Sequence, residues 1–222
     1  MVTVDGRRVS VSHPGRVLYP AREGSAAVTK AEVIDYYRAV ASTILPHIRS
    51  RPVTRKRWPR GVDESSFFEK NLPSSAPSWI PRSTLVHRDH ENVYPLVDSE
   101  AVLTWLGQQA ALELHVPQWR TDLPNPDAEV PGSPTAHFAD RIVFDLDPGE
   151  GSGLPECAEV ALEVRGLVEG SGLRCFPVTS GSKGIHLYIP LGRPTPPDDA
   201  SHVARRVAEA MAARHPRLVT AT

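Results

Sequence analysis

The sequence predicts an α+β fold with a largely antiparallel sheet core flanked by helices, formed by a single domain over residues 1–222. Three observations lead to this prediction. The chain has 222 residues, 40% of them apolar, which is enough for a substantial hydrophobic core. Segments that alternate apolar and polar residues, typical of half-buried strands, lie among segments with helical spacing. The two kinds follow no strict strand–helix–strand alternation, which argues against a parallel sheet.

The first elements are a hairpin and a helix. Residues 2–12 alternate around an Asp-Gly pair, which is a strong hairpin signal. Thr29 and Glu32 have the spacing of a capping box, which predicts a helix start. The helix is expected to stop at Pro46, because proline lacks an amide hydrogen. Its apolar positions at helical spacing are Val33, Ile34, Tyr37, Val40, Ile44 and Leu45.

The middle of the chain is predicted to be mostly loop. Residues 60–98 are rich in proline and serine and are expected to be irregular. Ser99 is expected to cap a helix that runs through Ala110. Residues 111–116 alternate, with Glu113 and His115 on the polar face of a strand. Residues 118–139 are expected to form a polar loop.

The last third predicts a strand, a helix, two strands and a final helix. The strand covers residues 141–147, and the helix runs from Pro155 to Gly170 with proline in its first turn. The next strands cover residues 174–179 and 185–189. The final helix covers residues 198–214, and the residues expected on its apolar face are Val203, Val207, Ala210 and Met211.

Composition excludes several classes of protein. The net charge is −1, so any nucleic-acid site must come from local clustering of basic residues. Cys157 and Cys175 form no CxxC pair and are expected to be free, buried thiols. The N-terminus has no apolar core typical of a secretory signal, and no segment approaches the roughly 20 apolar residues of a membrane span. The expected location is cytoplasmic, without a membrane partner.

Asp145 and Asp147 are the main candidates for chemistry. Residues two apart on a strand share a face, roughly 6.5–7 Å apart. Ile142, Phe144 and Leu146 then point into the core, and the two carboxylates point to the other face at the strand end. Such a pair favours a divalent cation between the carboxylates and suits two-metal phosphoryl transfer. Two solvated aspartates at a strand end are the alternative.

The segment SGSKGIH, residues 180–186, joins two predicted strands. Its glycines permit positive φ and a close approach of backbone amides to an anion. Lys183 supplies a positive charge, Ser180 offers a hydroxyl, and His186 lies on the polar face of the following strand. The segment is no Walker A loop, because GxxxxGK[ST] is absent. It predicts a phosphate contact, with a plain hairpin turn as the alternative.

A basic and aromatic segment covers residues 49–60, RSRPVTRKRWPR. It contains no acidic residue, and Trp58 lies within it. Cations beside an aromatic ring are typical of segments that bind phosphates and stack on bases, and a solvated basic loop is the alternative. We expect Phe67 to lie in the core, whereas core and surface are balanced for Phe68. His115 is a weaker candidate for the site, and it becomes a stronger one only if its strand lies beside Asp145.

Seven segments carry a family resemblance: VLYP at 17–20, TKAEVIDYY at 29–37, RPVTRKRWPRG at 51–61, SFFEKN at 66–71, LELHVPQW at 112–119, VFDLDPGEG at 143–151 and TSGSKGIHLYIPL at 179–191. Together and in this order they resemble the polymerase domain of bacterial ATP-dependent DNA ligase D, in the archaeo-eukaryotic primase superfamily. The resemblance implies a primase-like polymerase fold. It also implies template-dependent nucleotidyl transfer at broken DNA ends in non-homologous end joining. Ribonucleotides would be accepted.

The resemblance further implies ligands and partners. Two Mn²⁺ (or Mg²⁺) ions and a nucleoside triphosphate are expected, together with double-stranded DNA ends that carry a 5′-phosphate. Ku and ligase or nuclease modules are possible partners at the nucleoid. Asp145 and Asp147 match the catalytic metal ligands. Arg16 and Lys30 fall where the family binds the 5′-phosphate, and Arg16 replaces the usual lysine. The residues that match nucleotide contacts are Lys56, Phe68, His115, Ser180, Lys183 and His186.

One departure keeps alternatives open. The family carries a third catalytic aspartate on a strand beyond the last helix, and this sequence ends at LVTAT, residues 218–222, before that strand. The C-terminal strand region is therefore expected to be missing. Asp198 and Asp199 precede the last helix and do not match. The alternatives are a catalytically impaired module that binds DNA ends through the 5′-phosphate, and a metal-dependent phosphoesterase.

Overall fold

The computed structural model describes residues 1–87, 89–122 and 137–221. The chain divides into two compact units, Met1–Pro117 and Gln118–Thr222. Each unit has its own hydrophobic core, and each is described separately below. The single domain expected over residues 1–222 stays a prediction.

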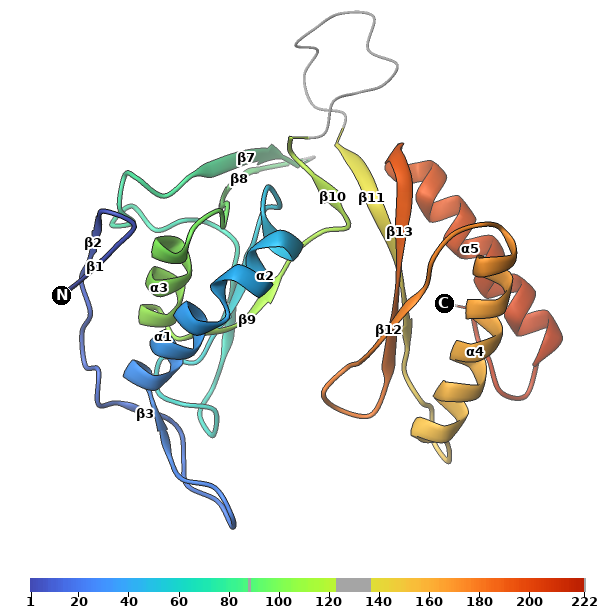
Figure 1. Ribbon diagram of the computed structural model, residues 1–222, viewed down its shortest axis with the longest axis horizontal. Coiled ribbons are helices and arrows are strands. Elements are labelled where there is room, and N and C mark those ends of the chain that lie inside the picture. Colours follow the sequence, from blue (N-terminus) through green and yellow to red (C-terminus); the bar gives the residue numbers. More distant parts are fainter. Residues whose placement is uncertain (88, 123–136, 222) are drawn as a thin grey trace, which may run out of the picture. The chain divides into compact units, whose positions relative to one another are not determined.

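The first unit begins with the expected hairpin. Strands β1 (Val2–Val4) and β2 (Arg7–Val9) pair antiparallel. Asp5 and Gly6 in the turn have φ of 48° and 70°, the left-handed values that a two-residue hairpin requires. A second pair, β3 (Val17–Tyr19) and β4 (Val28–Thr29), leads into the first helix (Figure 1).

The predicted helix start is confirmed, but its end was predicted wrongly. Helix α1 (Lys30–Ala39) has a complete capping box between Thr29 and Glu32. The chain leaves helical hydrogen bonding at Val40 and resumes it as α2 (Ala41–Ile48), with Pro46 inside. Pro46 lies in the last turn of α2 and removes the one helical bond that its own amide would have made to Ser42. Packing of the neighbouring apolar side chains on the core outweighs that loss.

Residues 60–98, expected to be irregular, contain three strands. β6 (Phe67–Glu69) pairs with β5 (Thr54–Arg57), which in turn pairs with β9 (Ala111–His115), giving the sheet order β6-β5-β9. β7 (Arg82–Val86) and β8 (Glu91–Pro95) form a separate antiparallel pair. These strands are short, and β6 and β7 are largely exposed, so pairing with other segments stabilises them more than their own apolar pattern does.

Helix α3 (Glu100–Gln108) lies at the centre of the first unit's core. Ser99 is its N-cap residue, as expected, but its side chain makes no cap hydrogen bond. Asp5 instead accepts a hydrogen bond from the Ala101 amide at 3.1 Å. The helix ends two residues earlier than expected, because Ala110 adopts φ of 52°. Leu112, Leu114 and Val116 pack on the core, as the alternation of β9 predicted.

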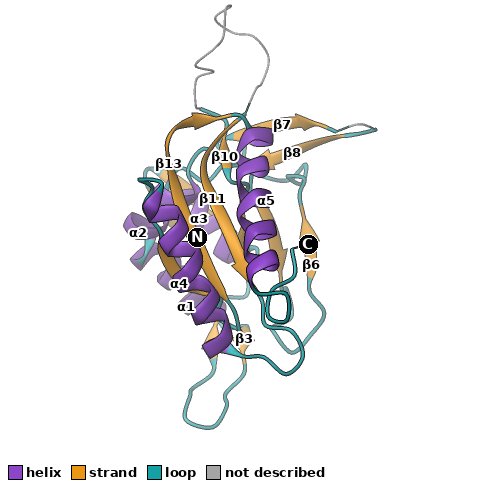
Figure 2. Ribbon diagram, turned by 90° about the vertical axis from the view of Figure 1, so that its right-hand side faces the viewer, coloured by secondary structure: helices purple, strands orange, loops and turns teal. Residues whose placement is uncertain are grey.

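The second unit is a four-stranded antiparallel sheet with two helices. Its order is β10 (Trp119–Arg120), β11 (Phe138–Leu146), β13 (Ile185–Thr195) and β12 (Phe176–Thr179). Two of these strands begin or lie within the expected loop 118–139, whose residues 123–136 are outside the description. Helices α4 (Leu154–Gly170) and α5 (Pro197–Arg214) pack on one face of this sheet (Figures 1 and 2).

The apolar face of α5 differs from the predicted one. Val203 is 48% exposed and Ala210 is also exposed. The side chains that pack toward the core are Ala200, Ala204, Val207 and Met211. These positions follow the i, i+4, i+7, i+11 spacing. Val207 and Met211 were predicted correctly, and Ala200 and Ala204 take the places predicted for Val203 and Ala210. Among the described helices, none is long and apolar enough to cross a membrane.

Candidate active site

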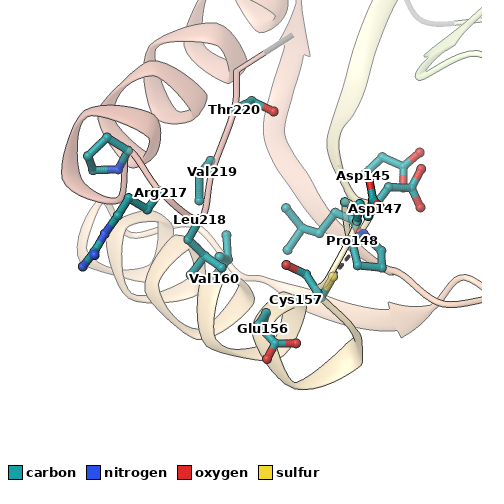
Figure 3. Close-up of a pocket in the computed structure, with 15 residues that line it drawn as sticks. Asp145, Asp147, Pro148, Glu156, Cys157, Val160, Arg217, Leu218, Val219 and Thr220 are labelled. Carbon is teal, nitrogen blue, oxygen red and sulfur yellow. Dashed lines mark hydrogen bonds between the residues drawn. The ribbon is translucent and has the colours of Figure 1, made fainter.

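Asp145 and Asp147 lie at the C-terminal end of β11, as predicted. Ile142 is buried, and Phe144 and Leu146 pack on the core of the second unit. The alternate positions therefore face away from the helices, and both aspartates are exposed. Figure 3 shows their side chains on the same side of the strand end. The period-two argument thus placed both carboxylates on the open face of the sheet.

His186 lies directly across the sheet from Asp145. The two residues are cross-strand partners in the β11–β13 pair, and His186 Nε2 is 3.2 Å from Asp145 Oδ1. The His186 ring also lies beside Tyr188, with ring centroids 6.3 Å apart. Pairing register therefore brings a ring nitrogen to one carboxylate oxygen of Asp145 and turns the imidazole to the same open face.

The SGSKG turn is held by internal hydrogen bonds and lies close to the end of β11. The Ser180 hydroxyl accepts hydrogen bonds from the Gly184 and Ser182 amides at 3.0 and 3.4 Å. Gly181 has φ of 83°, and Lys183 is exposed at the tip. A Cβ on Gly184 would lie 2.5 Å from the Leu146 carbonyl oxygen and 2.8 Å from Asp147 Oδ1. The turn backbone therefore touches the end of β11, which only glycine permits.

A cavity of about 320 Å³ adjoins the aspartates within the second unit. Its other wall is formed by residues 216–220, which follow α5, and by the start of α4 (Figure 3). Cys157 lines it and donates a hydrogen bond to the Leu146 carbonyl oxygen at 3.4 Å. Burial, with smaller contributions from Asp147 and Glu156, raises the pKa of the Cys157 thiol. Both cysteines are free, as expected.

The aspartate pair fits a divalent cation only as a partial ligand set. Carboxylate oxygens are the ligands that Mg²⁺ and Mn²⁺ prefer. Among residues 1–87, 89–122 and 137–221, no group of three His, Cys, Asp or Glu side chains could hold a metal ion. Mg²⁺ sites commonly use one or two carboxylates, with substrate phosphates and waters completing the shell. Asp145 and Asp147 fit that arrangement.

In the first unit, the three-stranded sheet gathers a second set of candidates. Lys56 is the cross-strand partner of both Phe68 and Glu113. Its ammonium lies 4.7 Å from the centre of the Trp58 ring and 5.5 Å from that of Phe68. The His115 ring meets Phe68 edge-on at 5.4 Å. Phe68 is 60% exposed, so it lies on the surface and not in the core, the two positions that the sequence left open.

Arg16 and Lys30 line one cavity of about 310 Å³, together with Arg57 and His13. Arg16 donates to the Pro59 carbonyl at 2.7 Å, and Lys30 Nζ donates to the Ser12 carbonyl at 3.0 Å. Burial lowers the pKa of Lys30, and the neighbouring charges of Arg16 and Arg57 lower it further. The cavity thus concentrates positive charge, which suits a phosphate group.

Two predictions for the basic and aromatic segment were wrong. Phe67, expected in the core, is 45% exposed and lies against the guanidinium of Arg57. Arg55, counted among the cations that could meet phosphates, is fully buried. It pairs with Glu69 and lies 5.6 Å from the centre of the Trp105 ring. Alternation along β5 explains the burial of Arg55, because it turns Arg55 inward and Lys56 outward.

Sequence reasoning missed His13 and Glu113. Arg57, a cation of the segment expected to meet phosphates, lines the phosphate cavity with His13, and no local pattern links either residue to Arg16 and Lys30. Glu113 hydrogen-bonds both Lys56 and His115. The signal for Glu113 was present, since it shares the polar face of its strand with His115. The structure brings Lys56, Phe68 and His115 together in the first unit. It groups the candidate residues Asp145, Asp147, Ser180, Lys183 and His186 in the second.

Similarity to known proteins covers nearly the whole chain. Residues 29–222 match the family model described as LigD, primase-polymerase domain. The multifunctional non-homologous end joining protein LigD of Mycolicibacterium smegmatis is 49% identical over 215 residues, 97% of this chain and 26% of that protein. The LigD of Mycobacterium tuberculosis is 48% identical over 222 residues, 100% of this chain and 28% of that protein. The bifunctional LigD of Bacillus subtilis is 35% identical over 163 residues, 73% of this chain and 24% of that protein.

A solved structure shares the fold. It is the polymerase domain from Mycobacterium tuberculosis ligase D in complex with DNA, with a TM-score of 0.85 and 49% identity. The similarity covers 97% of this chain and 72% of that one, and it confirms the α+β fold predicted from sequence. The chain spans about a quarter of the length of the curated relatives it matches. The chain belongs to the LigD primase-polymerase domain family.

Proposed function

We propose that this chain is a template-dependent nucleotidyltransferase domain that adds nucleotides, ribonucleotides included, at broken DNA ends during non-homologous end joining. One observation carries the proposal. The carboxylates of Asp145 and Asp147, the imidazole of His186 and the SGSKG turn meet at one end of β11. Carboxylates beside an anion-binding turn suit transfer of a phosphoryl group from a nucleoside triphosphate.

In the reaction, the 3′-hydroxyl oxygen of the primer forms a bond to the α-phosphorus of the nucleotide. The bond from that phosphorus to the bridging oxygen breaks, pyrophosphate leaves, and the hydroxyl proton passes to solvent. Asp145 and Asp147 would supply the protein ligands of two divalent ions, Mn²⁺ or Mg²⁺, and the ions would neutralise the charge of the leaving group. His186 orients the Asp145 carboxylate. The exposed ammonium of Lys183 and the hydroxyl hydrogen of Ser180 receive the triphosphate.

The first unit carries further residues to which the proposal assigns a role. Lys56, Phe68 and His115 bind the incoming nucleotide, with the exposed Phe68 ring stacking on its base. The proposed DNA partner is a duplex end with a 5′-phosphate. Support comes from the relatives, which are named as end-joining proteins, and from the similar structure, which was solved with DNA. Ku and ligase or nuclease modules are proposed as further partners.

The test is manganese-dependent addition of ribonucleotides to a gapped, 5′-phosphorylated duplex. It should be run on this chain and on a form that continues past Thr222, where the third aspartate is expected. Asp145→Ala should lower addition by at least about 1,000-fold, since each 1.36 kcal/mol of transition-state stabilisation is a factor of ten. Asp198→Ala, which removes an exposed carboxylate from α5, is the matched control.

Two outcomes would contradict the proposal. One is an absence of nucleotide addition by both forms of the protein. The other is an Asp145→Ala variant with unchanged activity. The identity of the leaving group separates polymerase from phosphoesterase, because nucleotidyl transfer releases pyrophosphate whereas a phosphoesterase releases inorganic phosphate.

A second function is supported by the cavity of Arg16, Lys30 and Arg57, namely recognition of the 5′-phosphate at a recessed DNA end. Three cationic side chains around one cavity would bind a phosphate monoester more tightly than an uncharged end. Fluorescence anisotropy with recessed duplexes that differ only in the 5′-phosphate tests this. Equal affinity for the two duplexes would exclude the cavity as the recognition site.

A further inference from the structure

Glu113 lies between Lys56 and His115, the two polar side chains to which nucleotide binding is assigned above. We propose that Glu113 is a positioning residue, which sets the place of the Lys56 ammonium and the tautomer of the neutral His115 ring for the incoming nucleoside triphosphate. The inference rests on the proposed function. It adds a residue that acts through Lys56 and His115 and does not itself contact the substrate.

One carboxylate serves both partners. Glu113 Oε1 accepts a hydrogen bond from Lys56 Nζ at 3.2 Å, and Glu113 Oε2 is 2.8 Å from His115 Nε2. Glu113 is the cross-strand partner of Lys56 in the β5–β9 pair and shares a face of β9 with His115. The two oxygens therefore fix the separation of the two nucleotide-binding groups.

Lys56 needs such an anchor. A lysine side chain has about four rotatable carbon–carbon and carbon–nitrogen bonds, and it loses much rotamer freedom when its ammonium is held at one point. The rings of Trp58 and Phe68 attract the ammonium from two sides, but a ring face fixes the position of a cation loosely. The Glu113 oxygen adds a directed, charge-assisted hydrogen bond.

His115 gains a defined set of donors and acceptors from the same contact. A carboxylate oxygen can only accept, so the proton of a neutral imidazole lies on Nε2, which faces Glu113. The other nitrogen, Nδ1, then presents a lone pair. His115 would accept a hydrogen bond from a hydroxyl or amino group of the nucleotide. Without Glu113 the ring could carry its proton on either nitrogen.

The charge of Glu113 contributes little to the stability of the fold. The Glu113 side chain is 44% exposed, and exposed ion pairs contribute little to folding. Burial on its own raises the pKa of Glu113, but hydrogen bonds from His115 and Lys56 outweigh it, and the net shift is downward. The carboxylate is therefore charged throughout the neutral range, and its two bonds persist wherever the enzyme would work.

The test measures binding of ATP with Mn²⁺ by calorimetry, using the whole chain. Glu113→Gln leaves one acceptor oxygen for two donors and should weaken ATP binding by about tenfold, the effect of one charge-assisted hydrogen bond. Glu113→Asp keeps the charge and should regain part of the affinity. The melting temperature should stay unchanged, which separates positioning from folding. Glu100→Gln is the matched control, because it breaks a comparable ion pair with Arg38 in the same unit.

A double-mutant cycle gives the decisive result. In a Lys56→Met background, Glu113→Gln should weaken ATP binding by clearly less than it does alone, because one of its two partners is gone. Equal binding by the wild type and Glu113→Gln, or full additivity of the two substitutions, would overturn the inference. A wild-type chain that binds no ATP would instead contradict the proposed function, and this inference with it.

Discussion

His186 and Asp145 are cross-strand partners, with Nε2 of the histidine 3.2 Å from Oδ1 of the aspartate. The family resemblance implied a triphosphate contact for His186. The geometry adds a different interaction, since the imidazole holds a carboxylate that is proposed to bind metal. A ring nitrogen 3.2 Å from a ligating carboxylate restricts the orientation of that ligand.

We therefore predict that His186→Ala raises the Mn²⁺ concentration needed for half-maximal nucleotide addition by about 10–100-fold, the usual effect of losing such a partner. His186→Gln retains an N–H donor and should lose less. Titration of Mn²⁺ in the addition assay measures both. His202→Ala, on the exposed surface of α5, should leave the titration unchanged. If His186→Ala and the wild type require the same Mn²⁺ concentration, His186 does not orient the Asp145 carboxylate for metal binding.

Gly184 determines how closely the SGSKG turn approaches β11. A methyl group on Gly184 would lie 2.5 Å from a backbone oxygen of Leu146, which cannot move aside without moving the strand end. Gly184→Ala should therefore destabilise the protein by about 1–3 kcal/mol, as overpacking does, and shift Asp147. Urea denaturation measures the stability, and the addition assay should show a parallel loss of activity.

The control for Gly184 is Gly166→Ala in the middle of α4. Apart from the adjoining backbone and chain neighbours of Gly166, no atom lies within 4 Å of its Cβ position. Alanine there should stabilise the helix by about 0.5–1 kcal/mol. If Gly184→Ala unfolds at the same urea concentration as the wild type, the close approach of the turn to Leu146 and Asp147 is not required.

Lys30 predicts a pH dependence for recognition of the 5′-phosphate. Burial, then Arg16 and Arg57, lower the pKa of Lys30, so its ammonium loses its proton at a lower pH than an ordinary lysine does. The preference for phosphorylated over unphosphorylated ends should therefore decline as pH rises, beginning below the usual lysine pKa of 10.5. Anisotropy titrations between about pH 7 and 10 measure this preference.

Substitutions identify the titrating group. Lys30→Arg stays charged over this range and should retain the preference at high pH. Lys30→Ala should have a weak preference at every pH, whereas Arg8→Ala, on the exposed β2 strand, should behave as the wild type. A Lys30→Arg variant that loses its preference at the same pH as the wild type would assign the titration to another group.

Local patterns were sufficient for several features. The Asp-Gly turn, the Thr29–Glu32 capping box and the core-facing alternation of β11 were all confirmed. Each depends on neighbours within a few residues, where turn chemistry and side-chain period determine the geometry. The α+β fold followed from the same signals, and the comparisons confirm it.

Other features depended on contacts between distant segments. Strands β6, β7 and β8 carry weak patterns and form because partners lie beside them. The Ala101 amide of helix α3 donates a cap hydrogen bond to Asp5, 96 residues earlier. Arg55 is buried because Glu69 and Trp105 compensate its charge, a pairing that composition cannot reveal.

The sequence by itself determined which face of β11 carries Asp145 and Asp147, because side chains alternate along any strand. Only the tertiary structure decided what meets them. Pairing register placed His186 opposite Asp145, and the packing of Gly184 on Leu146 brought the turn to Asp147. Register and packing are set by the sheet as a whole, so no local segment of the chain contains them.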